Sequence, residues 1–121
     1  MTRLVIIIPC LNEAATLRDV VGRIPSTIDR MGSIDVLVLD DGSTDDSVEV
    51  AESAGAKVLS NGIHRGLGTT FKRGMEAAIS LGADIIVNMD GDGQFRPEDI
   101  PRLVSPIVAD KADFVTASRF K

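Results

Sequence analysis

The chain alternates short, unbroken apolar runs with segments whose apolar positions recur every three or four residues. The runs Leu4–Ile8 and Val36–Leu39, and the run that starts at Ile85, are typical of strands buried on both faces. Two shorter strands are predicted at Lys57–Leu59, near a sheet edge, and at Asp113–Ala117. Strands that alternate with helices form parallel sheets covered on both faces, so we predict an α/β fold. The expected architecture is a three-layer α/β/α sandwich with a mostly parallel, Rossmann-like sheet.

The first two helices are predicted from their caps and their stops. Asn12 is a suitable cap for a helix that Pro25 ends or kinks. Ser43 or Thr44 is expected to cap a second, shorter helix that runs to about Ser53. The apolar face of the first helix is expected to consist of Leu17, Val20, Val21, Ile24 and Ile28.

Two further helices are predicted in the second half of the chain. One runs from about Leu67 to Leu81, where Gly82 stops it. The other starts at Pro97, which suits a first helical turn, and extends to about residue 109 with a kink at Pro106. The buried face of the helix from Leu67 is expected to consist of Phe71, Met75, Ala78 and Ile79.

The composition describes an ordinary globular chain of one domain, residues 1–121, with 44% hydrophobic and 26% charged residues. The net charge of −5 and the presence of Phe as the only aromatic residue argue against nucleic-acid binding. Cys10 is the only cysteine, so no intrachain disulfide can form and a reducing, cytoplasmic location is expected. The run Leu4–Ile8 is too short for a signal peptide or a membrane span, and no other segment is expected to cross a bilayer.

Polar side chains follow the predicted strands at their carboxyl ends. In an open parallel sheet these ends share one edge, where ligands bind in the crevice outside the strands. We therefore expect one ligand site at this edge, formed by residues from several strand ends. The polar residues in question are Asn12, Glu13, Asp40, Asp41, His64, Arg65, Asp90 and Asp92.

The acidic pair Asp90 and Asp92 follows the apolar run that starts at Ile85 and is set between glycines. Two carboxylates and the amide oxygen of Gln94 form a hard-oxygen set suited to Mg²⁺ or Mn²⁺ and a bound diphosphate. Turn chemistry explains an isolated Asp-Gly segment equally well, and only the shared sheet edge favours the ligand site. A calcium loop of the EF-hand type does not fit, because its glycine and glutamate positions hold Phe95 and Pro101.

Two other features leave alternatives open. Asp41 stands where a Rossmann fold places an acid for a ribose or base, although Asp40 or Asp41 could also simply start a turn. The pair Gly66-x-Gly68 could expose amide donors to an anion, but Phe71 stands at the third glycine position of the dinucleotide fingerprint. Tight packing of helix against strand is the favoured explanation of these two glycines.

Five segments spread over nearly the whole chain carry a resemblance to a known family: Ile8–Glu13, Leu39–Asp45, Arg65–Gly68, Asp90–Gln94 and Ala117–Phe120. They resemble motifs of the family-2 glycosyltransferases with the GT-A nucleotide-sugar-binding fold. The last segment is similar to the Ser-Arg-aromatic turn of the polyprenyl-phosphate sugar synthases, of which dolichyl-phosphate mannose synthase is the type. The resemblance implies an inverting transferase, a nucleoside diphosphate sugar as donor and a polyprenyl phosphate as acceptor.

The resemblance also assigns roles by position. Asp90, Asp92 and Gln94 are implied to hold the metal and the diphosphate, and Arg119 to face the diphosphate or the acceptor phosphate. Leu11 replaces an aromatic residue frequent in mannose synthases, so a GDP-sugar and a UDP-sugar both remain open. The implied substrate-binding residues are Pro9, Leu11, Glu13, Leu39, Asp41, Asp90, Gly91, Asp92 and Arg119.

Family members continue well beyond this length, so the chain resembles the donor-binding part of such an enzyme. No catalytic base is identified before Lys121, and the parent protein is expected to act at the cytoplasmic face of a membrane. In the family a later strand lies beside the fourth strand, which predicts a displaced strand near Phe114. Two alternatives remain, a non-catalytic nucleotide-binding module and a sugar nucleotidyltransferase, although the glycine-rich opening loop of the latter is missing.

Overall fold

The computed structural model describes residues 2–28, 31–89, 96–104 and 113–117. The strands of this part form one sheet in the order β3-β2-β1-β4-β5, and every neighbouring pair is parallel. The predicted parallel sheet is therefore confirmed, with the short strand β3 at an edge. The strand bounds are Thr2–Cys10 (β1), Met31–Asp40 (β2), Lys57–Ser60 (β3), Ile85–Met89 (β4) and Asp113–Ala117 (β5).

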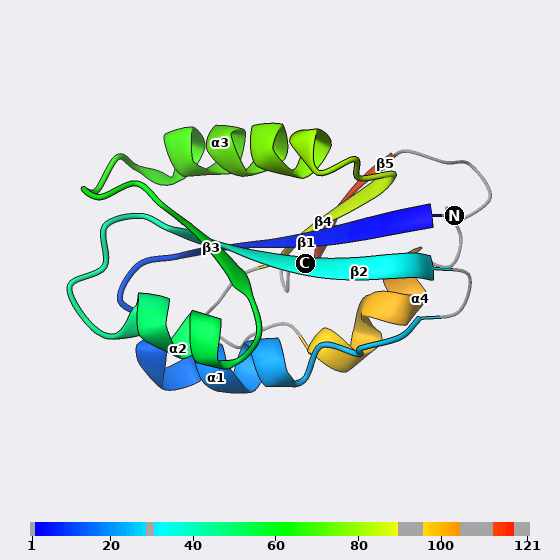
Figure 1. Ribbon diagram of the computed structural model, residues 1–121, viewed down its shortest axis with the longest axis horizontal. Helices are drawn as coiled ribbons and strands as arrows, with labels where there is room; N and C mark the ends of the chain where they lie inside the picture. The colour runs from blue at the N-terminus through cyan, green and yellow to red at the C-terminus, as the bar shows by residue number, and fades with distance from the viewer. Residues whose placement is uncertain (1, 29–30, 90–95, 105–112, 118–121) are drawn as a thin grey trace.

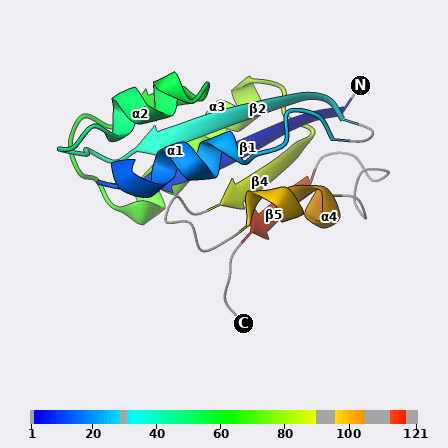
Figure 2. The ribbon, with the colours of Figure 1, turned by 90° about the horizontal axis from the view of Figure 1, so that it is seen from below.

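Helices cover the two faces of the sheet unequally, which gives the predicted three layers. Helix α3 lies alone on one face, whereas α1, α2 and α4 lie on the other (Figure 1). Seen from below, α4 lies beneath the β4–β5 side of the sheet (Figure 2). The helical segments are Ala14–Gly22 (α1), Ser47–Ser53 (α2), Leu67–Ser80 (α3), Pro97–Asp99 (η1, a 3₁₀ turn) and Ile100–Val104 (α4).

The core consists of two clusters separated by the sheet. Leu4, Ile6 and Ile8 of β1 pack toward α1, α2 and α4. Val5 and Ile7 pack toward α3. All five side chains are fully buried, because successive residues of a strand point to opposite faces and both faces are covered. The continuous apolar run of β1 is thus the signature of the central strand.

Strand β1 extends past the predicted apolar run Leu4–Ile8 and ends at Cys10. Pro9 lies within β1 and pairs with Leu39 of β2. The backbone oxygen of Cys10 accepts a hydrogen bond from the N–H of Asp41, so the backbone groups of Cys10 point toward β2. The backbone groups of the preceding residue, Pro9, therefore point to the opposite side, toward β4. The pairing of β1 with β4 ends at Ile7, and the missing N–H of Pro9 therefore costs no ladder hydrogen bond.

Strand β2 starts five residues before the predicted run. Its first half mixes apolar and polar residues, and this half pairs with the start of β1. The Asp35 carboxylate lies 3.1 Å from Nε of Arg3 and 3.6 Å from Nζ of Lys57. The sequence pattern missed this half because its apolar residues, Met31 and Ile34, are separated by polar positions and are only partly buried against the core.

The predicted caps of α1 and α2 are also wrong. Glu13 is the cap residue of α1, and α2 starts only at Ser47, after Asp46. Asn12, Ser43 and the residues around them instead bond to each other across the two loops, as the next subsection describes. Helix α1 ends at Gly22, three residues before Pro25. Ile28 therefore lies outside the helix, although its side chain is buried in the core.

Helix α3 matches its predicted span, and Gly82 follows it with a φ of +85°. Its buried face differs from the predicted one, because Ile79 is 64% exposed whereas Thr70 and Gly74 are buried beside Ala78. Phe71 and Met75 are half-buried. A Cβ at Gly74 would lie 2.1 Å from Cδ1 of Leu39, so this glycine sets the close contact between α3 and β2. The tight-packing explanation offered for Gly66 and Gly68 is wrong, because a Cβ at either would meet nothing within 4 Å.

The expected displacement of the strand near Phe114 is not observed. Strand β5 pairs with β4 over its whole length, from Ile85 opposite Asp113 to Met89 opposite Ala117. Strand β5 thus takes the hydrogen bonds of the β4 edge that faces away from β1. Helix α4 is described only to Val104, so the predicted kink at Pro106 lies outside the described residues.

Candidate functional site

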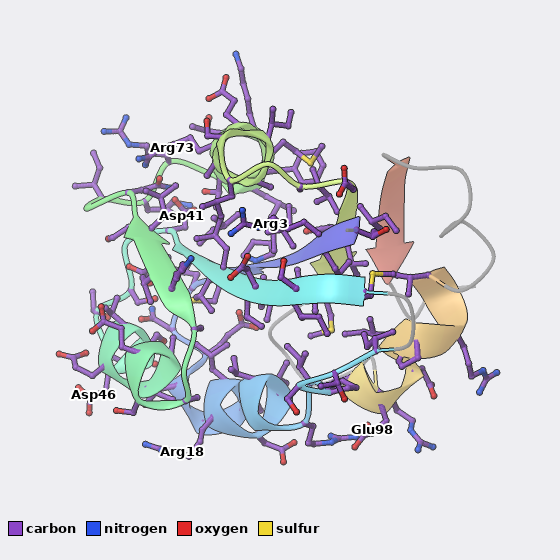
Figure 3. The ribbon with its side chains drawn as sticks, turned by 45° about the vertical axis from the view of Figure 1, so that its right-hand side comes forward. Arg3, Arg18, Asp41, Asp46, Arg73 and Glu98 are labelled. Atoms are coloured by element: carbon purple, nitrogen blue, oxygen red, sulfur yellow. The ribbon has the colours of Figure 1, made fainter. Side chains whose placement is uncertain are left out.

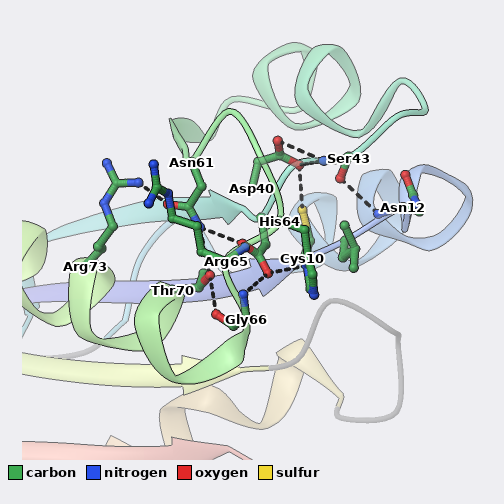
Figure 4. A network of polar contacts seen from close by, with 12 residues as sticks. Cys10, Asn12, Asp40, Ser43, Asn61, His64, Arg65, Gly66, Thr70 and Arg73 are labelled. Atoms are coloured by element: carbon green, nitrogen blue, oxygen red, sulfur yellow. Dashed lines mark hydrogen bonds and ion pairs between the residues drawn. The ribbon is translucent and has the colours of Figure 1, made fainter.

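The carboxyl ends of three neighbouring strands form the candidate site. Cys10, Asp40 and Ser60 end β1, β2 and β3 and stand side by side in the sheet. The loops that follow them exchange hydrogen bonds around these ends (Figure 4). Strand β4, on the other side of β1, ends at Met89 at the same edge. The predicted clustering of strand ends is therefore confirmed for the described residues.

The carboxylate of Asp41 is buried at this edge, with a residue exposure of 5%. Its Oδ1 accepts hydrogen bonds from Nδ2 of Asn61 at 2.7 Å and from the backbone N–H of Arg65 at 2.8 Å. Its Oδ2 accepts one from the N–H of Gly66 at 3.0 Å and lies 2.8 Å from Nδ1 of His64. A carboxylate has about four acceptor sites. All four are filled by the loop between β3 and α3.

The charge of Asp41 is fixed by these donors. Burial by itself would raise the pKa of the carboxyl group. The hydrogen bonds from Arg65, Asn61 and Gly66 outweigh burial and lower the pKa to about 2. Asp41 therefore carries a full negative charge at neutral pH, on the face of the sheet that α3 covers (Figure 3).

The side chain of Asp40 lies on the opposite face of the sheet from that of Asp41 and binds the loop that follows β2. Its carboxylate accepts hydrogen bonds from the backbone N–H of Ser43 at 3.3 Å and from Oγ of Ser60 at 3.2 Å. Sγ of Cys10 lies 3.9 Å from Oδ1 of Asp40. Burial and the charge of Asp40 raise the pKa of the Cys10 thiol to about 12. Cys10 therefore stays protonated, and its place in the core fits the role of an apolar filler.

Asn12 joins the loop after β1 to the loop after β2. Its Oδ1 accepts hydrogen bonds from the backbone N–H of Thr44 at 2.7 Å and of Asp45 at 3.2 Å. Its own N–H donates to Oγ of Ser43 at 2.9 Å. Asn12 has a φ of +54°, a left-handed conformation that asparagine tolerates better than most residues. The Asn side chain thus caps a loop rather than its own helix.

A second set of bonds joins the same two loops at the start of α1. The N–H of Glu13 donates to Oγ of Ser47 at 3.0 Å, and the N–H of Ala14 donates to Oδ2 of Asp45 at 3.2 Å. These groups satisfy N–H donors at the helix start, where no intrahelical partner exists. The carboxylate of Glu13 turns back to accept from the N–H of Leu11 at 3.3 Å.

The structure brings together several of the predicted substrate-binding residues. Pro9 is the second-last residue of strand β1, and Leu11, just beyond the strand, is 40% exposed. Glu13 and Asp41 lie in the joined loops described above. Leu39 is different, because its side chain is 1% exposed beneath α3 and only its backbone reaches the strand end. The predicted residues that lie outside the described part are Asp90, Gly91, Asp92, Gln94 and Arg119.

The fit to a metal rests on the chemistry of the donor set. The part of the chain with described positions contains no group of three or more His, Cys, Asp or Glu side chains arranged to hold a metal ion. The candidate ligands Asp90, Asp92 and Gln94 follow Met89 directly, at the edge where β4 ends. Two carboxylates and an amide oxygen suit a small divalent cation such as Mg²⁺ or Mn²⁺.

Sequence reasoning missed several residues that shape this edge. Ser43, Ser47 and Asn61 hold the loops in place, and nothing in their local sequence indicates partners twenty or more positions away. Asn88 was also missed, although a polar residue inside an apolar strand is a usable signal. Its Oδ1 is the buried side-chain polar atom that lacks a hydrogen-bond partner in the described part of the chain. Asn88 lies on the α3 face, like Asp41.

Among the residues with described positions, no helix has both the length and the apolar character needed to cross a bilayer.

Comparison with known proteins adds a family to this geometry. The model of the family described as Glycosyl transferase family 2 matches residues 5–121. An undecaprenyl-phosphate mannosyltransferase of Micrococcus luteus is 35% identical over 97% of this chain, which covers 48% of that protein. A UDP-N-acetylglucosamine–dolichyl-phosphate N-acetylglucosaminyltransferase of Methanococcus voltae is 29% identical over 96% of this chain and 51% of its own length. The chain thus spans about half the length of these relatives.

A solved structure agrees with the same family. Glucosyl-3-phosphoglycerate synthase of Mycobacterium tuberculosis, in complex with Mn²⁺, UDP and glucosyl-3-phosphoglycerate, superposes with a TM-score of 0.71. The two chains are 29% identical, and the match covers 88% of this chain and 40% of the synthase.

Proposed function

Because this chain belongs to glycosyl transferase family 2, with the α/β fold of GT-A glycosyltransferases, we propose that residues 1–121 form a nucleotide-sugar-binding unit. The parent enzyme would transfer a sugar from a nucleoside diphosphate sugar to a polyprenyl phosphate, with inversion. The single observation that carries this proposal is the shared sheet edge. Met89, the last described residue before Asp90–Gln94 in the sequence, ends β4 at the same edge as the strand ends beside Asp41.

In this proposal the base and ribose lie against the ends of β1 and β2. Leu11 offers an exposed apolar side chain, and Asp41 a charged acceptor. Three of the four donors to Asp41 are the side chain of Asn61 and the backbone N–H groups of Arg65 and Gly66. The fourth, His64, is 64% exposed at its side chain. An N–H or O–H group of the nucleotide would therefore bind Asp41 by replacing His64.

The diphosphate would lie nearer the end of β4. Asp90, Asp92 and Gln94 would hold a Mg²⁺ or Mn²⁺ ion, and Arg119 would face the diphosphate or the acceptor phosphate. Such an ion neutralises negative charge that grows on a leaving diphosphate. The synthase that shares this fold was solved with Mn²⁺ and UDP, which supports a divalent metal and leaves UDP and GDP as candidates here.

The acceptor class is supported by the relatives. Those of Micrococcus luteus and Methanococcus voltae are named for transfer to undecaprenyl phosphate and dolichyl phosphate. A phosphate acceptor is already an anion, so its attack on the sugar needs no strong general base. A lipid-borne acceptor and a single buried, protonated Cys10 fit a site at the cytoplasmic face of a membrane.

Calorimetric titration tests the donor site directly. The 121-residue chain is titrated with UDP and with GDP, each with and without Mn²⁺. We expect one nucleotide to bind in a metal-dependent manner and Asp92→Ala to abolish the metal dependence. Asp19→Ala, which removes an exposed carboxylate of α1, is the matched control and should bind like the parent. Equal binding by Asp92→Ala and the parent would refute the proposed metal role.

A further inference from the structure

The loop between β3 and α3 presents large apolar side chains to solvent. Ile63 is 64% exposed and Leu67 is 70% exposed, and Arg65 lies exposed between them. A single exposed apolar residue is ordinary on a protein surface. Two of them flanking a cation within five positions form an apolar and basic tip, which we define as residues 62–67 and call the β3–α3 loop.

This loop is held in a fixed shape from below. Asp41 accepts hydrogen bonds from the N–H groups of Arg65 and Gly66, at 2.8 and 3.0 Å. Gly42 lies so close that a Cβ there would be 2.5 Å from the backbone nitrogen of His64 and 2.6 Å from the carbonyl carbon of Ile63. The exposed side chains therefore project from an ordered backbone. Binding through them needs little further ordering of the loop.

The surroundings of the loop are basic in an acidic chain. Residues 61–75 contain Arg65, Lys72 and Arg73 and no Asp or Glu, a formal charge of +3. The whole chain carries −5, so the remaining residues together carry −8. The local charge is thus complementary to an anionic surface, while most of the chain is repelled by one.

We propose that the β3–α3 loop docks on the surface of a membrane that contains anionic lipids. Ile63 and Leu67 would enter the boundary between headgroups and acyl chains, and Arg65 would lie at the level of the anionic headgroups. Exposed apolar residues next to basic ones are the combination that such an interface binds. The inference deepens the proposed function, since the loop follows β3 at the same sheet edge as the site. Docking would bring the donor site to a lipid-borne acceptor.

Vesicle flotation tests the docking surface. The 121-residue chain is mixed with vesicles of phosphatidylcholine alone or with added phosphatidylglycerol, in the absence of nucleotide and metal. We expect binding to the anionic vesicles only, weakened by salt. The variant Ile63→Ser/Leu67→Ser should bind about tenfold more weakly, and Arg65→Gln should lose much of the preference for anionic lipid. Ile79→Ser is the matched control, because Ile79 is equally exposed on α3 and should not matter.

Three outcomes would overturn the proposal. The parent chain could fail to bind anionic vesicles, or the double variant could bind them as well as Ile79→Ser does. A third outcome is that the parent does not bind vesicles but forms a dimer that the double variant loses on size-exclusion chromatography. In that case the loop contacts a second copy of the chain. Nucleotide and metal are absent throughout, so a failed donor titration leaves this test unaffected.

Discussion

The amide oxygen of Asn12 lies 2.7 Å from the backbone nitrogen of Thr44, and this hydrogen bond ties the loop after β1 to the loop after β2. The same oxygen accepts from the N–H of Asp45. Both loops carry residues of the proposed donor site, among them Leu11 and Asp41. The position of the loop that carries Leu11 therefore depends on the position of the loop that carries Asp41.

Replacement of Asn12 by alanine should destabilise the fold by about 2 kcal/mol, because the change removes the acceptor and leaves a left-handed residue with a Cβ. Asn12→Asp keeps the acceptor, and Asn12→Gly relieves only the backbone strain. We expect free energies of unfolding in urea to rank Asp above Gly and Gly above Ala. An alanine variant as stable as the aspartate variant would contradict the role of the hydrogen bonds.

The carboxylate of Asp41 should make stability depend on acid. Its pKa is about 2 in the folded chain, against an ordinary value of 3.8. Because the folded pKa is the lower one, the contribution is complete above about pH 4 and is lost as the pH falls toward 2, on the order of 2 kcal/mol. Urea unfolding of the parent and of Asp41→Asn at several pH values measures it. The variant should be less stable at pH 7 and lack this part of the acid slope, whereas Asp19→Asn should retain it.

A side chain at position 74 should destabilise the fold, because a Cβ on Gly74 would lie 2.1 Å from Cδ1 of Leu39. We expect Gly74→Ala to cost about 1–3 kcal/mol. Gly68→Ala is the matched control in the same helix, since its Cβ would meet nothing within 4 Å and should stabilise by about 0.5–1 kcal/mol. In a double-mutant cycle, Leu39→Val should recover part of the loss in Gly74→Ala. Additive losses would show that the two residues do not clash.

The buried amide of Asn88 should lower the free energy of unfolding of the isolated chain. Its buried amide oxygen lacks a partner among the described residues, and such a group costs about 1–3 kcal/mol. Asn88→Leu should therefore raise the thermal midpoint, and Asn88→Asp should lower it at neutral pH by placing a charge there. A leucine variant that unfolds at a lower temperature than the parent would mean that the amide is satisfied in solution.

The sequence predicted those parts of the fold that depend on local patterns. Apolar runs located β1 and β4, and Gly82 marked the end of α3, because burial on both faces and a left-handed stop leave a local signature. The strand ends also clustered as the parallel topology requires. These features follow from rules that act over a few residues or over a whole sheet.

The helix caps and the hydrogen-bond partners of Asp41 could not be predicted in the same way. Asn12 has the right chemistry for a helix cap, but its acceptors serve Thr44 and Asp45, more than thirty positions away. The donors to Asp41 likewise come from the loop that holds Arg65 and Gly66. A side chain that can satisfy either near or distant N–H groups is assigned only when the packing of the loops is known.

The position of β1 in the middle of the sheet has a consequence for synthesis of the chain. Leu4 pairs with Ile34 on one side and with Ile85 on the other. On the ribosome, β1 therefore emerges before both of its neighbours and acquires the second one only after Ile85 has been made. Contacts this distant in sequence slow folding and leave apolar strand edges exposed in the interval. The nascent chain is thus most prone to aggregate before Ile85 leaves the exit tunnel.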